Sequence, residues 1–352
     1  LSANVTVSGS GTASSQNVAN GITITQGNLG TLALGGSDAG SYNINTIATN
    51  NLVTVDISKK PVNLTGSRNY DGTTSANASN LSYTLNNLIA GESLVLSGSG
   101  TVASKDVSAG TQNITLGSIT LADNTGVASN YSLTSGTMSV SQKQVNLTGT
   151  KVYDNNTTLS NSIISVASGL VGSETLGLSG NVVTNSSNVG TYLSSANQLN
   201  SGSTTIALTN GTNGGLGNNY TINEGTFTIT ERAITIVGTK VYDGTKTVSA
   251  ANIGTFNNTV GGQTLTITGN TSFLESAGVG SGKTITLTGL ALGNGSGVAS
   301  NYSLSSGTFS VTARPVTLTT SRFFDNTKNV DATNLSVTFN NLVGSETLSL
   351  SG

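Results

Sequence analysis

The residues of this chain whose side chains could do chemistry recur in a short phrase that appears four times. In each phrase a basic residue is followed, two positions on, by an aromatic residue, an aspartate and a Gly or Asn. A cation, a ring and a carboxylate in this order could hold an anionic sugar or a metal ion, or could build a tight turn. The phrases are Arg68-Asn69-Tyr70-Asp71-Gly72, Lys151-Val152-Tyr153-Asp154-Asn155, Lys240-Val241-Tyr242-Asp243-Gly244 and Arg322-Phe323-Phe324-Asp325-Asn326.

We expect the aspartate of each phrase to cap its own turn rather than bind a metal ion. Asp-Gly favours the positive backbone angles of tight turns, and Asn is the next best residue at the second position. Calcium would need several clustered acidic oxygens, and the sequence has no Asp-x-Asp-x-Asp cluster. The phrase therefore predicts a turn and no metal site.

Catalysis is not expected. Histidine and cysteine are absent, which removes the commonest general bases and nucleophiles. Paired carboxylates remain, but Glu92, Glu174 and Glu346 share one repeated position that is Gln263 in another copy, and this exchange favours a solvated turn. We predict that the protein is not an enzyme and uses no cofactor.

Two repeated basic positions allow two interpretations. They could be solvated guards that prevent lateral pairing of exposed strand edges. They could also form a basic ladder that holds an anionic surface polysaccharide in a salt-sensitive way. The first position is Lys60, Lys143, Arg232 and Arg314, and the second, eight residues on, is Arg68, Lys151, Lys240 and Arg322.

Composition limits the possible partners. The chain has 13 Lys and Arg against 15 Asp and Glu, so no nucleic-acid footprint is present. No apolar run approaches the length of about 18 residues needed to cross a bilayer, and we expect no membrane insertion. The absence of cysteine fits a large exported surface protein, which predicts an extracellular or cell-surface location.

The spacing of the phrases, 83, 89 and 82 residues, predicts a tandem array. Within a unit, short alternating runs such as 61–66 and 81–85 are separated by turn residues, and no helical stripe is present. This favours an all-β array of small antiparallel sandwich-like repeats forming an elongated rod, with a β-solenoid as the alternative, although a solenoid coil would repeat every 20 to 30 residues or fewer. The predicted segments are a partial repeat 1–58, repeats 59–141, 142–230 and 231–312, and a partial repeat 313–352.

Aromatic residues are expected in each small core together with Leu, Val and Ile. A second motif lies late in the repeat, around Tyr131 and Tyr302. Replacing Tyr242 of the phrase by Ala should cost on the order of 3 kcal/mol. The repeat-defining aromatic residues are Tyr70, Tyr131, Tyr153, Tyr220, Tyr242, Tyr302 and Phe324.

These two motifs resemble the YDG repeat, a relative of the mostly-β, glycine-rich repeats of very large bacterial exoproteins. The matching segments are 148–154 and 237–245 around the phrase, and 127–133 and 298–304 around Tyr131 and Tyr302. Asn155 and Asn326 depart from Gly, and Phe324 departs from Tyr. The resemblance implies a filamentous-haemagglutinin-like secreted adhesin exported by two-partner secretion, and it supplies no binding residues.

We therefore expect the structural shaft of a bacterial surface adhesin or matrix filament, acting in adhesion, aggregation or biofilm formation. Its partners would be neighbouring repeats of a longer chain, other copies in a filament, and surface polysaccharide. The alternative is a multivalent carbohydrate-binding array, in which weak sites are multiplied by avidity. Sugar platforms usually use Trp or exposed Tyr, and Trp is absent.

Overall fold

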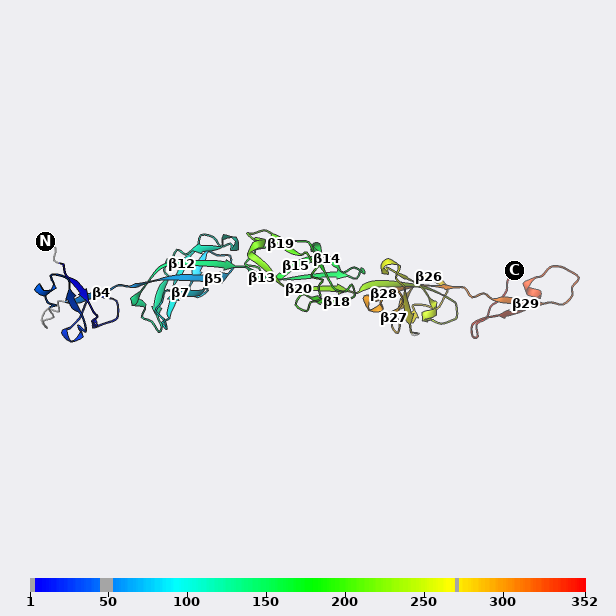
Figure 1. The fold of residues 1–352 in the computed structure, drawn as a ribbon. Coiled ribbons are helices and arrows are strands. Elements are labelled where there is room, and N and C mark those ends of the chain that lie inside the picture. The colour runs from blue at the N-terminus through cyan, green and yellow to red at the C-terminus, as the bar shows by residue number, and fades with distance from the viewer. Residues whose placement is uncertain (1–3, 45–52, 270–271) are drawn as a thin grey trace. The chain divides into compact units, whose positions relative to one another are not determined.

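The computed structural model describes residues 4–44, 53–269 and 272–352, so that 1–3 and 45–52 of the predicted segment 1–58 lie outside the described residues. Many small sheets and short 3-10 helices confirm the all-β prediction (Figure 1), and this part of the chain contains neither an α-helix nor a solenoid. The chain divides into two compact units, Leu1–Val145 with Ser168–Gly177 and Leu208–Asn223, and Asn146–Ala167 with Leu178–Ala207 and Glu224–Gly352.

The elements follow one order in each repeat. The first partial repeat contains β1 (Thr6–Ser8), β2 (Ala19–Thr23), η1 (Gln26–Asn28), β3 (Ala33–Gly35), η2 (Ala39–Ser41) and β4 (Thr54–Ile57). Repeat 59–141 contains β5 (Lys60–Asn69), β6 (Ser75–Asn77), β7 (Ser82–Asn86), β8 (Leu94–Ser97), β9 (Ser99–Thr101), η3 (Val107–Ala109), β10 (Thr111–Asn113), β11 (Thr120–Asp123), η4 (Ala128–Asn130) and β12 (Tyr131–Ser141).

The later repeats continue this order. Repeat 142–230 contains β13 (Lys143–Val152), β14 (Thr158–Ser160), η5 (Asn161–Ile163), β15 (Ile164–Ser168), β16 (Leu176–Ser179), β17 (Asn181–Val183), β18 (Gly190–Leu193), β19 (Ala207–Asn210), η6 (Gly217–Asn219) and β20 (Tyr220–Thr230). Repeat 231–312 contains β21 (Arg232–Val241), β22 (Thr247–Val248), η7 (Ala250–Asn252), β23 (Ile253–Asn257), η8 (Val260–Gly262), β24 (Leu265–Thr268), β25 (Ser272–Leu274), β26 (Gly280–Thr286), β27 (Ala291–Asn294), η9 (Ala299–Asn301) and β28 (Tyr302–Thr312). The last segment contains β29 (Thr317–Ser321), η10 (Ala332–Asn334) and β30 (Ser336–Asn340).

The first and last strands of a repeat lie side by side and run parallel, which departs from the antiparallel pairing expected throughout. β5 pairs with β12 from Lys60 opposite Tyr131 to Asn69 opposite Ser141 (Figure 1), and β21 pairs with β28 in the same way. The intervening 60 or so residues supply the long connection that a parallel pair requires. Because the two strands point the same way, the chain leaves each repeat at the end opposite to the one where it entered.

The main sheets are built around these pairs, with orders β10-β12-β5-β7, β15-β13-β20-β18 and β22-β25-β26-β28-β21-β23. A second, two-stranded sheet accompanies each of them: β8-β11, β16-β19 and β24-β27. Leu94 of β8 packs against Val62 and Tyr131 of the main sheet. A small core therefore lies between the two sheets of the repeat.

Alternation along the first strand decides which side chains enter the core. Val62 and Leu64 of β5 are buried while the residues between them are exposed, and Ile234 and Ile236 of β21 repeat the pattern. The last strand carries a glycine opposite this stripe, and a Cβ on Gly307 would lie 2.7 Å from Cγ1 of Ile236. The core side chains of the first strand therefore fill the space that a larger residue would need.

Consecutive repeats join with almost no linker. β12 ends at Ser141 and β13 begins at Lys143, and β20 ends at Thr230 before β21 begins at Arg232. Four residues separate β28 from β29. The last strand of one repeat thus leads directly into the first strand of the next.

Candidate functional site

Three of the four phrases follow the first strand of their repeat and lie beside the end of its last strand. The Tyr70 N–H donates to the carbonyl of Ser141, the last residue of β12, at 2.8 Å, and the Tyr242 N–H donates likewise to Thr312 at 2.9 Å. Oδ1 of Asp71 accepts the Thr73 N–H at 2.9 Å, which closes a turn two residues long. The residue after the aspartate has a positive φ in all four phrases: Gly72 (78°), Asn155 (62°), Gly244 (76°) and Asn326 (63°).

The basic residue of the phrase fills the inside of this turn. Lys240 Nζ lies 2.7 Å from Asp243 and donates to the Thr245 and Thr247 carbonyls at 3.0 and 2.8 Å. Only 3% of its side chain is exposed. Arg68 pairs with Asp71 in the same manner, as Lys151 does with Asp154 and Arg322 with Asp325.

The expectation of solvated edge guards is therefore wrong for Arg68, Lys151 and Lys240. Each turns inward because the carboxylate and carbonyl oxygens of the turn satisfy its charge. The same three cations could not contribute to the predicted polysaccharide-binding ladder, because they are buried against their own turns. Burial alone would raise the pKa of the Asp243 carboxyl, but the Lys240 ammonium and the Thr245 donors outweigh it and hold that pKa below its usual value.

At the first basic position, two arginines hold a different turn. Nε of Arg232 donates to the Asn258 carbonyl at 2.7 Å, and its Nη2 donates to Asn258 Oδ1 at 2.7 Å. Arg314 binds Asn341 through the same atoms at 2.8 and 2.6 Å. Both asparagines have positive φ, so Arg232 fixes the turn after β23 and Arg314 fixes the turn after β30. Lys60 and Lys143 are half-buried.

The joint between repeats 59–141 and 142–230, called the first joint below, is built on a buried carboxylate. Tyr70, from the phrase of repeat 59–141, donates to Glu174 Oε1 at 2.7 Å, and Tyr220 of the following repeat donates to Oε2 at 2.6 Å. The two rings meet edge to face, with centroids 5.4 Å apart. Lys105 Nζ lies 3.4 Å from Oε1 and 5.7 Å from the centre of the Tyr70 ring. One carboxylate thus ties two repeats together.

Hydrogen bonds favour the charged form of the Glu174 carboxylate in this joint. Burial raises the pKa of Glu174, but the two phenols and Lys105 more than offset it, so the pKa lies below its ordinary value. Burial and the hydrogen bond to Glu174 raise the pKa values of Tyr70 and Tyr220. With 7% of Glu174 exposed, the expectation of a solvated turn is wrong for Glu174, whereas Glu92 is half-buried and Glu346 is exposed.

The second joint uses an amide at the same place. Tyr302 donates to Gln263 Oε1 at 2.5 Å, and Gln263 Nε2 donates to the Tyr153 phenol at 3.2 Å. The Tyr153 phenol in turn donates to Asn155 Oδ1 at 3.2 Å. The rings again meet edge to face at 5.3 Å.

Two further carboxylates belong to this set. Tyr242 donates to Glu346 of the last segment, and Tyr131 donates to Glu92 within its own repeat. Tyr242 is half-buried and packs against the cluster of Ile236 and Phe309. The tyrosine–acceptor pair is therefore a repeated device.

An asparagine for which no role was predicted makes a second contact at three of the joints. Asn219, one residue before Tyr220, accepts the Val107 N–H at 2.9 Å and donates to Asp106 at 2.8 Å in the preceding repeat. The equivalent contacts join Asn301 to Asn188 and Val189, and Asn130 to Asn17 and Val18. Asn219 and Asn301 are fully buried. The sequence could have indicated this role, because an asparagine directly precedes each of Tyr131, Tyr220 and Tyr302.

The last phrase corrects one expectation. Phe324 was expected in a core, but 92% of it is exposed, as is 96% of Phe323. Among the described residues no tyrosine or carboxylate covers it in the way that Tyr220 and Glu174 cover Tyr70. Tyr70 is thus covered by residues of the following repeat, while Tyr242 also packs against the core of its own repeat.

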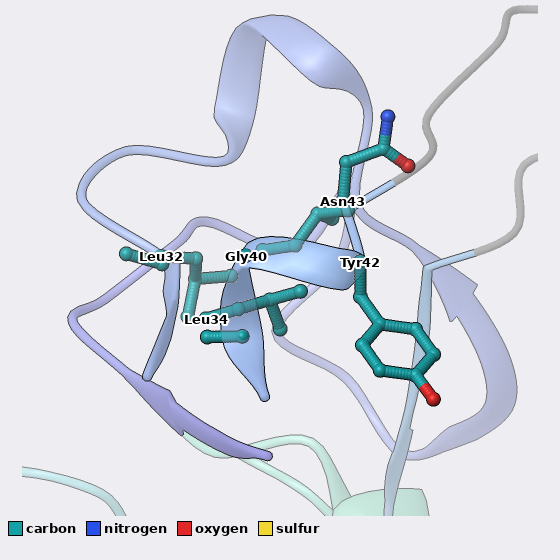
Figure 2. Close-up of a pocket in the computed structure, with 8 residues that line it drawn as sticks. Leu32, Leu34, Gly40, Tyr42 and Asn43 are labelled. Atoms are coloured by element: carbon teal, nitrogen blue, oxygen red, sulfur yellow. The ribbon is translucent and has the colours of Figure 1, made fainter. Parts of the chain in front are cut away.

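A shallow hollow of about 410 Å³ lies beside η2 in the first partial repeat. It is lined by Leu32, Leu34, Tyr42 and Asn43, among others, and Figure 2 shows the Tyr42 ring and the Asn43 amide pointing in opposite directions. Tyr42 follows η2 as Tyr131 follows η4, but 55% of Tyr42 is exposed whereas Tyr131 is buried.

The described residues hold no group of three or more His, Cys, Asp or Glu side chains that could bind a metal ion. Over the same residues, none of the helices is long and apolar enough to span a membrane. The chemistry that the repeats offer is thus hydrogen bonding between tyrosine, carboxylate and amide groups at their ends.

The geometry defines a class of protein, a tandem array of all-β repeats bonded to one another through their ends. Comparison with protein-family models finds the YDG domain twice, at residues 57–139 and 226–309. These segments overlap the predicted repeats 59–141 and 231–312. A search of curated proteins gives no match.

Proposed function

We propose that the chain is the shaft of a bacterial cell-surface adhesin or extracellular filament, acting in adhesion, aggregation or biofilm formation. The observation that carries this proposal is the repeated joint, in which one repeat is bonded to the next through a tyrosine, a Glu or Gln, and an asparagine. The parallel pairing of first and last strands supports it, because a chain that leaves each repeat opposite its point of entrance extends with every repeat added.

Secretion by a two-partner route and a location on the cell surface belong to the same proposal. They rest on the resemblance of the two motifs to filamentous-haemagglutinin-like exoproteins and on the lack of cysteine. Antibodies raised against the repeats should label intact cells, and brief protease treatment of those cells should remove the signal. Labelling seen only after the cells are broken would contradict this location.

Electron microscopy of the purified chain in negative stain tests the shaft directly. We expect thin rods, and a variant in which residues 142–312 are duplicated should give rods that are longer and no thicker. Compact particles of unchanged length would overturn the proposal.

The alternative of a carbohydrate-binding array has less support. Such an array would need an exposed ring or cation at the same place in each repeat. The phrase tyrosines Tyr70 and Tyr153 are buried, and the phrase cations bind their own turns. Binding of the chain to a glycan array, lost on mutation of a repeated surface position, would restore this alternative.

A further inference from the structure

The two fully enclosed joints solve the same hydrogen-bonding problem in different ways. A carboxylate has two acceptor oxygens, so Glu174 takes the proton of Tyr70 on one and that of Tyr220 on the other. A glutamine has one acceptor oxygen and one donor nitrogen. Gln263 accepts from Tyr302 at 2.5 Å and donates to Tyr153 at 3.2 Å. Its Oε1, already bonded to Tyr302, lies 3.3 Å from the Tyr153 hydroxyl, so the Tyr153 proton is shared with a second acceptor.

Asn155 supplies that acceptor. Its Oδ1 receives the Tyr153 proton at 3.2 Å and lies 3.5 Å from the Ser187 hydroxyl. The corresponding residue of the carboxylate joint is Gly72, which has no side chain and is not needed, because Glu174 receives both protons. Lys105 stands there in place of Ser187 and adds a cation beside the carboxylate.

Packing reinforces the difference. A Cβ on Gly72 would lie 2.8 Å from Cγ1 of Val171 in the next repeat, closer than real Cβ contacts come. Gly244, whose tyrosine binds Glu346, stands in the same relation to Val343 at 2.8 Å. An asparagine at either glycine would therefore displace the valine methyl of the neighbouring repeat, whereas the amide joint, which carries Val260 at the same place, accommodates Asn155.

We propose that the residue after the phrase aspartate and the acceptor of the following repeat form a two-residue code, Gly with Glu or Asn with Gln, that determines which repeat can dock on which. This rests on the proposed function as a tandem array. Along the chain the pairs are Gly72 with Glu174, Asn155 with Gln263 and Gly244 with Glu346. A surface that presents Asn after its aspartate fits a repeat whose acceptor is an amide.

Hydrogen exchange on the full chain can test the code, because one amide crosses each joint. The Val189 N–H donates to Asn301 across the Gln joint, and the Val107 N–H donates to Asn219 across the Glu joint. We would measure both in Asn155→Gly, in Gln263→Glu and in the combination, made with and without Ser187→Lys. The Val107 amide is the internal control.

Each single change should speed exchange at Val189 about tenfold, since it leaves a phenol or a carboxylate poorly matched in a buried site. At least one combination should return exchange to within about threefold of the parent, with Val107 unchanged throughout. The code is overturned if the single changes leave exchange at Val189 unaltered. It is also overturned if, in both combinations, exchange at Val189 is accelerated by the product of the two factors measured in the single variants.

Acidification gives a second readout that a purely structural role would not produce. Glu174, which faces Tyr70, Tyr220 and Lys105, stabilises its joint above its unfolded pKa of about 4.3, and this stabilisation is lost as pH falls through the lower folded value. After correction for intrinsic rates, exchange at Val107 should rise about tenfold per pH unit below 4.3, while parent Val189 should not respond. The rescued combination should make Val189 acid-sensitive, and a Val189 amide that stays insensitive in that variant argues against the code.

Failure of this test would leave the shaft proposal standing, because the imaging of rods does not depend on which residues match. Compact particles in the microscope, with the code intact by hydrogen exchange, would be the reverse result. The two proposals can therefore fail separately.

Discussion

At the scale of single residues, the phrase works as a capped and charged turn. The cation occupies the inside of the turn, the aspartate receives the N–H two residues on, and the residue with positive φ reverses the chain. These three roles leave the aromatic ring free to point toward the next repeat. The ring is therefore the part of the phrase that acts between repeats.

Replacing Lys240 by Met should destabilise repeat 231–312 by about 2 kcal/mol. The change leaves Asp243 without its cation and two carbonyls without a donor, and the cost stays below that of a fully buried pair because 46% of the Asp243 side chain is exposed. Urea unfolding of the full chain, followed by exchange within this repeat, measures it. Lys246→Met is the matched control, since Lys246 is exposed. Equal losses in the two variants would contradict the role of Lys240.

Removing one phenol should loosen the first joint without damaging either repeat. Tyr70→Phe deprives Glu174 of a hydrogen bond to a charged acceptor, which costs about 1.5 to 3 kcal/mol. Exchange at the Val107 amide should rise at least tenfold. In the control Tyr83→Phe, the lost partner is the Leu96 N–H of the same repeat, so Val107 should not change. A larger response at Val107 in the control would place the effect inside the repeat.

At the scale of elements, the central parallel pair sets the direction of each repeat. A bulge recurs in its last strand, where the register shifts between Leu133 and Ser135 in β12 and opposite the step from Ile234 to Thr235 in β28. The bulged residue holds the facing strand, since the Ser305 hydroxyl donates to the Ile234 carbonyl at 2.9 Å. The bulge thus helps to fix the register of the two strands.

The glycine of this last strand should not tolerate a methyl group. In Gly307→Ala the new Cβ would lie 2.6 Å from Ile285 Cγ2 and 2.7 Å from Ile236 Cγ1, and relief of that contact should cost about 1 to 3 kcal/mol. Gly254→Ala in β23 is the control, because its nearest neighbour would be the Val237 carbonyl oxygen at 3.6 Å. Thermal unfolding compares the two. A control that falls as far as Gly307→Ala would refute the packing argument.

Local patterns of the sequence were enough for the strands and turns but not for the way they combine. The alternation around Val62 and Leu64 predicts a half-buried strand, and Asp71-Gly72 predicts the turn after it. The parallel partner of that strand lies some 70 residues away, and no local pattern reports the direction of pairing. Glu174 was misread for the same reason, because the tyrosine that desolvates it is 104 residues distant.

At the scale of the whole molecule, the chain is a series of similar repeats. Neighbouring repeats share part of their cores. Tyr153, Tyr192 and Ile229 of repeat 142–230 cluster with Ile234, Leu265 and Tyr302 of repeat 231–312, whereas Val62, Leu94 and Tyr131 cluster within repeat 59–141. Stability in such an array is the sum of repeat terms and nearest-neighbour terms. The repeats should therefore unfold one at a time when the chain is extended.

Pulling the chain by its ends should show this as a series of separate steps. The three complete repeats contain 82 to 89 residues, so each step should release about 29 nm of chain at about 3.4 Å per residue. Single-molecule force measurements provide the check. One event releasing the length of all three repeats at once would mean that the repeats do not fold as separate units.

The Gly–Glu and Asn–Gln pairs also bear on how such a gene could grow. Duplicating repeat 142–230 alone would set Asn155 against Glu174, and duplicating repeat 231–312 alone would set Gly244 against Gln263. Duplicating the two together would set Gly244 against Glu174 and leave every pair matched, so natural variants lengthened within 142–312 should gain both repeats at once, an increment of 171 codons.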